Sequence, residues 1–137
     1  MLEIAFEIAK SAHAGQVDKA GVDYIQHPLF VASQVDSEAE KAVALLHDVM
    51  EDSDMTAEDL LAVGLPVEVV EAAEILTKKK GQDYQKYLEV VKANELARVV
   101  KIADLKHNSD LSRLSNITNL DNERVQKYVK AIQYLTS

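Results

Sequence analysis

One segment of this chain places four ionisable side chains directly after a run of apolar ones. Residues 42–46 are all apolar, and the next six positions contain His47, Asp48, Glu51 and Asp52. Charged groups beside a core need a partner or a metal to compensate for their lost hydration. On a helix, the i,i+4 spacing puts His47 and Glu51 on one face and the two aspartates on the neighbouring face. The segment therefore predicts a divalent cation site; the alternative is an ordinary helix end with a hydrogen-bonded histidine and solvated acids.

A second group of polar side chains interrupts an apolar segment further along the chain. Asp104, His107 and Asn108 are spaced i, i+3 and i+4, so they project from the same side of a helix. Taken alone, Asp104 would cap the helix or pair with Lys101. Taken with the first segment, it belongs to a set of two histidines and two aspartates from three helices: His27, His47, Asp48 and Asp104. Such a set suits an octahedral or five-coordinate ion with positions left open for water.

Composition restricts which metals and which classes of binding partner this chain can have. The 137 residues include no cysteine, which excludes disulfides and thiolate ligands and favours Mn, Fe, Zn or Mg over Cu(I). A formal charge of −8 argues against nucleic-acid binding, and a phosphate substrate would need local positive charge from a metal and a few lysines. There is no apolar run near the length of a membrane span and no signal-peptide pattern, so we expect a cytoplasmic protein that does not use a membrane.

Apolar residues recur at helical spacing along the whole chain and predict an all-α bundle. The expected helices are 2–13, 27–35, 37–48, 57–63, 66–80, 83–93, 96–105 and 121–135. Residues 99–102 have strand propensity, but no second strand candidate exists to pair with them. The lysines at 78–80 are interpreted as basic residues at the negative end of a helix dipole, with phosphate binding as the alternative. The length predicts one domain, 1–137, whose last helix either closes the bundle or supports a homodimer.

Several motifs occur in the order and spacing of a known family. They are Gly15-Gln16, Lys19-Ala-Gly21, Tyr24-Ile-Gln-His27-Pro28, Leu45-Leu-His47-Asp48-Val-Met-Glu51-Asp52 and Lys101-Ile-Ala-Asp104-Leu-Lys-His107-Asn108. Over about residues 5–115 the chain resembles the HD-domain hydrolases, and within them the RelA/SpoT-type alarmone hydrolase domain. The resemblance implies the helical HD bundle with a single Mn²⁺ bound by His27, His47, Asp48 and Asp104.

The resemblance also implies a reaction. That reaction is hydrolysis of the 3′-diphosphate of ppGpp or pppGpp to GDP or GTP and pyrophosphate, in the stringent response. Glu51 and Asp52 would position the attacking water and accept its proton, and Asn108 would orient a phosphate or that water. Substrate charge would be offset by three lysines: Lys19, Lys101 and Lys106.

Several alternatives remain open at this stage. The family's loop reads Arg-Lys-x-Gly, whereas this chain has Asp18 before Lys19, which makes another phosphorylated nucleotide such as NADPH a rival substrate. His13 either serves the pocket or is bonded to backbone at a helix end. Two further hypotheses are a nucleotide-sensing module without turnover and a helical interaction domain that binds no small molecule. A chelator would separate the last one, because it predicts no metal-dependent stability.

Overall fold

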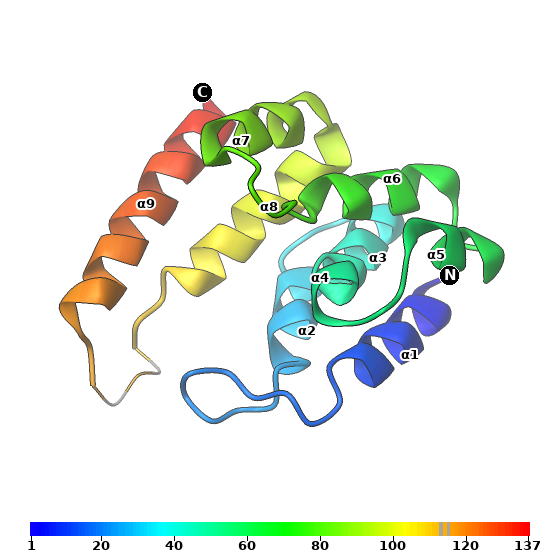
Figure 1. Ribbon diagram of the computed structural model, residues 1–137, viewed down its shortest axis with the longest axis horizontal. Helices are drawn as coiled ribbons and strands as arrows, with labels where there is room; N and C mark the ends of the chain where they lie inside the picture. The colour runs from blue at the N-terminus through cyan, green and yellow to red at the C-terminus, as the bar shows by residue number, and fades with distance from the viewer. Residues whose placement is uncertain (113, 115) are drawn as a thin grey trace.

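The computed structural model describes residues 1–137 except positions 113 and 115 (Figure 1). The described residues form nine helices and no β-sheet, which confirms the all-α prediction. The helices are α1 (Leu2–Ala12), α2 (Gln26–Ser33), α3 (Glu38–Leu46), α4 (Val49–Asp52), α5 (Ala57–Ala62), α6 (Val67–Leu76), α7 (Tyr84–Ala93), α8 (Glu95–Asn108) and α9 (Asn119–Thr136). Residues 99–102 lie inside α8, so helix was the correct choice for them.

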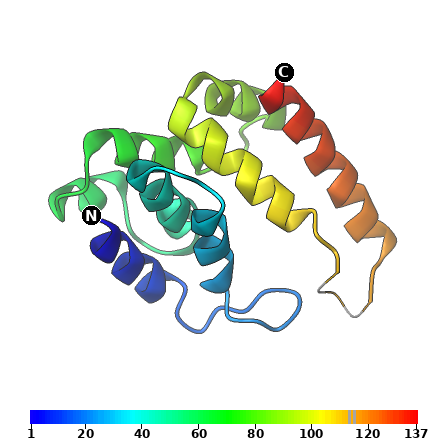
Figure 2. The ribbon, with the colours of Figure 1, turned by 180° about the vertical axis from the view of Figure 1, so that it is seen from behind.

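Two helices, α3 and α8, organise the packing. The apolar run 42–46 is buried along its whole length, and α3 packs against α1, α2, α6 and α8. In turn, α8 packs against α2, α3, α6, α7 and α9, so α3 and α8 lie centrally in both ribbon views (Figures 1 and 2). This contact brings the end of α3 close to the middle of α8.

The C-terminal helix α9 lies along α8 and α7, at the opposite side of the molecule from α1 (Figure 2). Its residues Ala131 and Leu135 are buried in the same core as α3. The start of α9 faces the loop between α1 and α2, where Lys19 contacts Asp121. Of the two roles expected for this helix, closing the bundle is the one the packing shows.

Several helix starts agree with the capping residues in the sequence, whereas helix ends differ from the prediction, among them those of α3 and α6. Ser37, Thr56 and Thr118 each accept a hydrogen bond from a backbone N–H of their own first turn. The predicted helix 37–48 ends at Leu46, because Asp48 has φ −110° and ψ 0°, and a separate short helix α4 follows.

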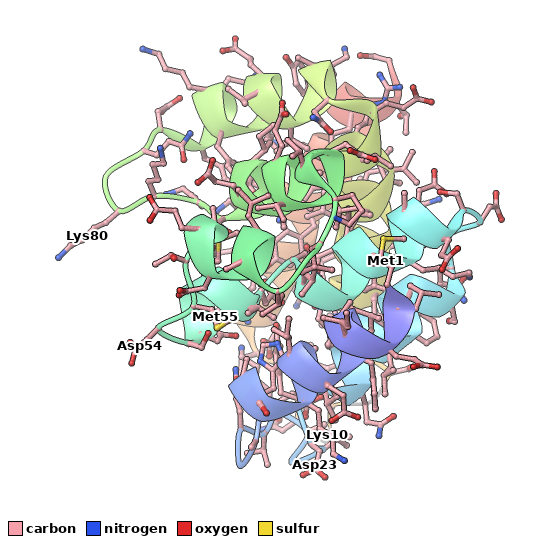
Figure 3. The ribbon with its side chains drawn as sticks, turned by 90° about the vertical axis from the view of Figure 1, so that its right-hand side faces the viewer. Met1, Lys10, Asp23, Asp54, Met55 and Lys80 are labelled. Carbon is pink, nitrogen blue, oxygen red and sulfur yellow. The ribbon has the colours of Figure 1, made fainter. Side chains whose placement is uncertain are left out.

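The second difference concerns the lysine run. Helix α6 ends at Leu76, and Thr77 is extended, so residues 78–80 lie beyond the helix rather than in its last turn. The N–H of Lys78 donates to the Glu51 carboxylate instead of continuing the helix. Figure 3 shows Lys80 on the loop that projects between α6 and α7. The predicted end of this helix at residue 80 was therefore wrong.

Among the described residues, no helix combines the length and apolar character needed to cross a membrane.

Candidate metal centre

Three buried side chains from separate parts of the bundle converge on one point. His27 comes from the first turn of α2, His47 directly follows α3, and Asp104 lies on α8. The Oδ1 atom of Asp104 is 2.7 Å from Nε2 of His27 and 3.3 Å from Nε2 of His47. One ligand atom from each residue lies within 4.8 Å of the others. These are three of the four residues predicted as metal ligands.

Local hydrogen bonds orient the two imidazoles. The chain turns tightly before α2, where the N–H of His27 donates to the carbonyl of Tyr24. At the end of α3, Nδ1 of His47 lies 2.6 Å from the carbonyl oxygen of Ala44 and donates to it. This bond turns Nε2 of His47 toward Asp104, so the break after Leu46 is what aims this side chain.

The donor set fits a divalent cation. Nitrogen and oxygen ligands about 2.1 Å from a shared ion lie about 3 Å apart when they subtend a right angle. The separations of 2.7 and 3.3 Å within this group bracket that spacing. Two imidazoles and a carboxylate are ordinary ligands for Zn, Mn or Fe. The buried group of His27, His47 and Asp104 could therefore hold a metal.

The fourth predicted ligand, Asp48, lies at the edge of this group. Its Oδ2 is 3.0 Å from Nε2 of His47 and accepts a hydrogen bond of 2.5 Å from the Tyr24 hydroxyl. Burial alone would raise the pKa of Asp48, but the attraction of His47 and the hydrogen bonds it accepts lower that pKa to about 2. Tyr24 belongs to one of the sequence motifs, but the sequence alone assigned it no role in the site.

A proton on His47 balances the carboxylates. Burial would lower the pKa of His47, but the two aspartates that face it, Asp48 and Asp104, outweigh burial and raise that pKa well above its usual range. Both ring nitrogens face oxygen acceptors, as an imidazolium requires. A metal would take over this positive charge, since a metal-binding imidazole must give up the proton on its ligand nitrogen.

Two of the residues predicted to bind substrate contact the Asp104 carboxylate. Lys101 Nζ lies 3.2 Å from its Oδ2, and Asn108 Nδ2 donates to its Oδ1 over 3.1 Å. Burial opposes ionisation of Asp104, but Lys101 and His47 hold its pKa well below the usual range. By contrast, Lys106 is exposed and lines a different cavity with Phe30, so the structure does not bring it to the metal centre.

The two predicted catalytic residues, Glu51 and Asp52, accept hydrogen bonds from different neighbours. Glu51 accepts from the N–H of Lys78, and burial raises its pKa. Asp52 Oδ2 accepts from Nε2 of Gln16 over 3.3 Å. The expected stacking of Glu51 above His47 on one continuous helix is not formed, because the helix breaks between α3 and α4.

His13 reaches the site through side chains. Its Nδ1 lies 3.0 Å from Oε1 of Gln16 and 3.6 Å from Oδ2 of Asp52, and its ring packs 4.8 Å from that of Tyr24. The His13 side chain is fully buried, and its Nε2 atom has no hydrogen-bond partner among the residues that the structure describes. Of the two roles considered for His13, the structure favours contact with side chains of the site over a bond to backbone at the helix end.

A cleft of about 350 Å³ opens beside the metal centre, between the loop that follows α1 and the start of α9. Tyr24 and Asn108 line it on the metal side, and Arg124 and Tyr128 of α9 line it on the other. Predicted substrate residue Lys19 lines the cleft too, with its Nζ bound to Asp121 at 2.9 Å. Sequence reasoning missed the two α9 residues, since no motif marked them.

Asp18, which replaces an arginine of the family's loop, also lines this cleft. Its Oδ1 accepts from the backbone N–H groups of Ala20 and Val22, so this carboxylate shapes its own loop.

Known proteins resemble this chain in both sequence and fold. The guanosine-3′,5′-bis(diphosphate) 3′-pyrophosphohydrolase of Vibrio cholerae is 43% identical over 89 residues, which are 60% of this chain and 12% of that one. The bifunctional (p)ppGpp synthase/hydrolase SpoT of Escherichia coli is 34% identical over 122 residues, 78% of this chain and 17% of that one.

Over most of its length the chain is similar to proteins named as pyrophosphohydrolases or SpoT. A further pyrophosphohydrolase, from Spiroplasma citri, is 34% identical over 91% of this chain and 18% of its own length. The chain therefore spans less than a fifth of the length of these three curated relatives. No protein-family model matches it.

A solved structure shares the fold of this chain. It is described as a metazoan ortholog of SpoT that hydrolyses ppGpp and plays a role in starvation responses. The two superpose with a TM-score of 0.79 and 23% identity over 98% of this chain and 84% of that one. The expected HD-type helical bundle is thereby confirmed.

Proposed function

We propose that this chain is a metal-dependent hydrolase that removes the 3′-diphosphate from ppGpp or pppGpp, with residues 1–137 acting as a single HD hydrolase domain. The observation that carries the proposal is the buried convergence of His27, His47 and Asp104 from three parts of the bundle. Curated relatives named as pyrophosphohydrolases support the same reaction.

The proposed metal is Mn²⁺, with His27, His47, Asp48 and Asp104 as its ligands. When bound, a divalent cation at this position polarises a phosphoryl oxygen and lowers the pKa of a coordinated water. Asp48 joins the other three by a small change, since its Oδ2 already lies 3.0 Å from Nε2 of His47. The Tyr24 hydroxyl, which donates to that oxygen, keeps the carboxylate directed at the site.

The reaction transfers a phosphoryl group to water. The water oxygen attacks the phosphorus bonded to O3′, and the bond from phosphorus to O3′ breaks. O3′ takes up a proton and leaves as the 3′-hydroxyl of GDP or GTP, and the diphosphoryl group leaves with the water oxygen as pyrophosphate. Glu51 and Asp52 hold the attacking water, and Asp52 accepts its proton. Gln16, which donates to Asp52, fixes the direction of this carboxylate.

Charge on the substrate is offset by Lys19 and Lys101, and Asn108 orients a phosphate or the water. Lys101 is half-buried, and its Nζ lies beside the proposed ligand Asp104, where a phosphoryl group would also lie. Lys19 and Asn108 line the cleft that leads to the metal centre. Transfer of a phosphoryl group depends mainly on such positioning and electrostatics.

We further propose that the chain acts in the cytoplasm on a small nucleotide and binds neither nucleic acid nor a membrane. A net charge of −8 repels a nucleic-acid backbone. The alternative to a monomer is a homodimer, and gel filtration with light scattering would distinguish the two.

The deciding experiment is a turnover screen of Mn²⁺-loaded protein against ppGpp, NADPH and common nucleotides. The proposal expects pyrophosphate from ppGpp and no turnover by the Asp48→Ala variant. Orthophosphate from NADPH would reassign the substrate while keeping the site. Binding of ppGpp without any product would favour a sensing module, and equal rates for Asp48→Ala and wild type would overturn the proposed metal site.

A further inference from the structure

His107 is a buried imidazole with no part in the reaction proposed above. It lies on α8, and its Nδ1 is 2.7 Å from Nδ1 of His27. The His107 ring stacks on Phe30, with centroids 4.3 Å apart, and on His27, with centroids 4.9 Å apart. This residue therefore contacts the side of His27 that faces away from Asp104.

Proton placement follows from these contacts. A hydrogen bond between two imidazole nitrogens needs one proton, so one ring donates and the other accepts. If His27 binds a metal through Nε2 as a neutral ring, its proton must be on Nδ1. Then Nδ1 of His107 is the acceptor, and His107 carries its own proton on Nε2.

The metal-free arrangement requires the opposite order. Nε2 of His27 lies 2.7 Å from Oδ1 of Asp104, and a carboxylate oxygen accepts a hydrogen bond. His27 then holds its proton on Nε2, and its Nδ1 accepts from Nδ1–H of His107. The order of donor and acceptor between the two rings is therefore reversed when a metal takes the Nε2 atom of His27.

We propose that His107 is a positioning residue that fixes the ring orientation of His27 and exchanges tautomers with it when the metal binds. This inference rests on the proposed metal site. Partners of this kind on metal-binding histidines typically change metal affinity by about 10- to 100-fold when they are removed. Stacking on Phe30 holds the His107 ring in the plane that this hydrogen bond needs.

Two substitutions separate the hydrogen bond from the packing. His107→Phe keeps a stacked ring but removes the acceptor, and a cavity of about 420 Å³ beside His107 gives the larger ring room. His107→Asn loses the ring, but its Oδ1 or Nδ2 occupies the place of Nδ1 and can accept or donate. Titration calorimetry with Mn²⁺ measures the affinity of each variant, and circular dichroism checks its fold.

We expect His107→Phe to weaken Mn²⁺ binding by about 10- to 100-fold and His107→Asn to stay within about threefold of wild type. Equal Mn²⁺ affinity of His107→Phe and wild type, or equal losses in both variants, would overturn the positioning role alone. Absence of any Mn²⁺ binding by the wild type would overturn the proposed metal site itself.

A measurement on the unaltered protein covers the case in which a variant does not fold. Nitrogen-15 spectra of the histidine rings distinguish the two tautomers, and Zn²⁺ serves as a diamagnetic probe. The proposal expects the protonated nitrogen of His27 to change from Nε2 to Nδ1 on addition of Zn²⁺, and that of His107 to change from Nδ1 to Nε2. Spectra of His107 that stay unchanged on addition of Zn²⁺ would contradict it.

Discussion

At the scale of single residues, Lys101 is the cation that compensates Asp104 inside the protein. Burial would lower its pKa, but Asp104 and the nearby Tyr87 outweigh burial and raise it. Lys101→Met leaves a buried carboxylate with less compensation, so we expect the metal-free protein to lose about 3 kcal/mol of stability. With Mn²⁺ present the loss should be smaller, because the ion replaces the missing charge.

Urea unfolding with and without Mn²⁺ measures both losses. Lys106→Met is the matched control, since Lys106 lies on the same helix and is exposed. A loss that is the same in both conditions would show that Lys101 acts through packing and not through its charge.

Gln16 offers a second test at this scale, because its amide lies between His13 and Asp52. Its Oε1 faces Nδ1 of His13 while its Nε2 donates to Asp52, so His13 fixes which way the amide points. Gln16→Glu puts a carboxylate against Asp52, and the two should repel. We expect kcat to fall about tenfold to a hundredfold with little change in KM, since the general base loses its position. Kinetics alongside the Gln85→Glu surface control measure this, and a change confined to KM would assign Gln16 to substrate binding instead.

Much of the metal centre could be predicted from residue types and spacing. His27, His47 and Asp104 interrupt apolar segments, where an uncompensated polar group is costly. The partners of these residues could not be predicted in this way. Tyr24 binds Asp48 across 24 positions and His107 binds His27 across 80, and such contacts depend on how the helices pack.

At the scale of helices, the N-terminal cap of α3 carries stability without touching the site. Ser37 accepts from the N–H of Glu40, and the Glu40 carboxylate accepts from the N–H of Ser37. The backbone N–H of Ser37 is the main cause that lowers the pKa of Glu40. Ser37→Ala should cost about 1 kcal/mol. Nine helical residues separate this cap from His47, a length of about 13 Å, so turnover at low temperature should not change.

Chemical denaturation and turnover of Ser37→Ala, measured on one preparation, give the two quantities. A fall in turnover larger than the fall in folded fraction would mean that the cap also positions His47.

Helix identity was predictable at this scale, and helix ends were less so. Apolar spacing marks each of the eight longer segments, and a capping side chain marks the start of five of them, because burial and backbone hydrogen bonding both act locally. The break after Leu46 follows instead from a hydrogen bond between the His47 side chain and the carbonyl oxygen of Ala44. Helix α6 ends where the Glu51 carboxylate accepts a hydrogen bond from the N–H of Lys78. Each of these bonds competes with the regular helix, and the second joins residues 27 positions apart.

At the scale of the whole molecule, a bound ion would join segments that are separate in the unfolded chain. Its ligands lie on α2, at the end of α3 and on α8. An ion that binds only the native state at 100 times its Kd adds about 2.7 kcal/mol. For a domain of this size that stabilisation is a rise of about 10 °C in Tm. Melting with Mn²⁺ and with EDTA tests this, and an Asp104→Asn variant should lose the difference; equal melting of wild type in both solutions would point to a helical interaction domain.

A second long-range connection ties the loop after α1 to α9, where the Nζ of Lys19 lies 2.9 Å from Asp121 across 102 positions. The N–H of Thr118 and the ammonium of Lys19 hold the pKa of Asp121 below its usual range. A carboxyl group whose pKa is lower in the folded state stabilises that state above its unfolded pKa, about 3.9, and loses this contribution as pH falls. Asp121→Asn keeps a capping side chain but removes the charge.

The difference in stability between wild type and Asp121→Asn should therefore be constant near pH 7 and shrink as pH falls below about 4. Thermal unfolding from pH 7 to pH 3 measures it. Asp54→Asn is the control, since Asp54 is exposed on the loop after α4 (Figure 3). A difference that does not change with pH would mean that Asp121 acts through its shape. A difference that shrinks with pH would show that a charge pair holds α9 against the loop, and both partners line the cleft beside the candidate metal centre.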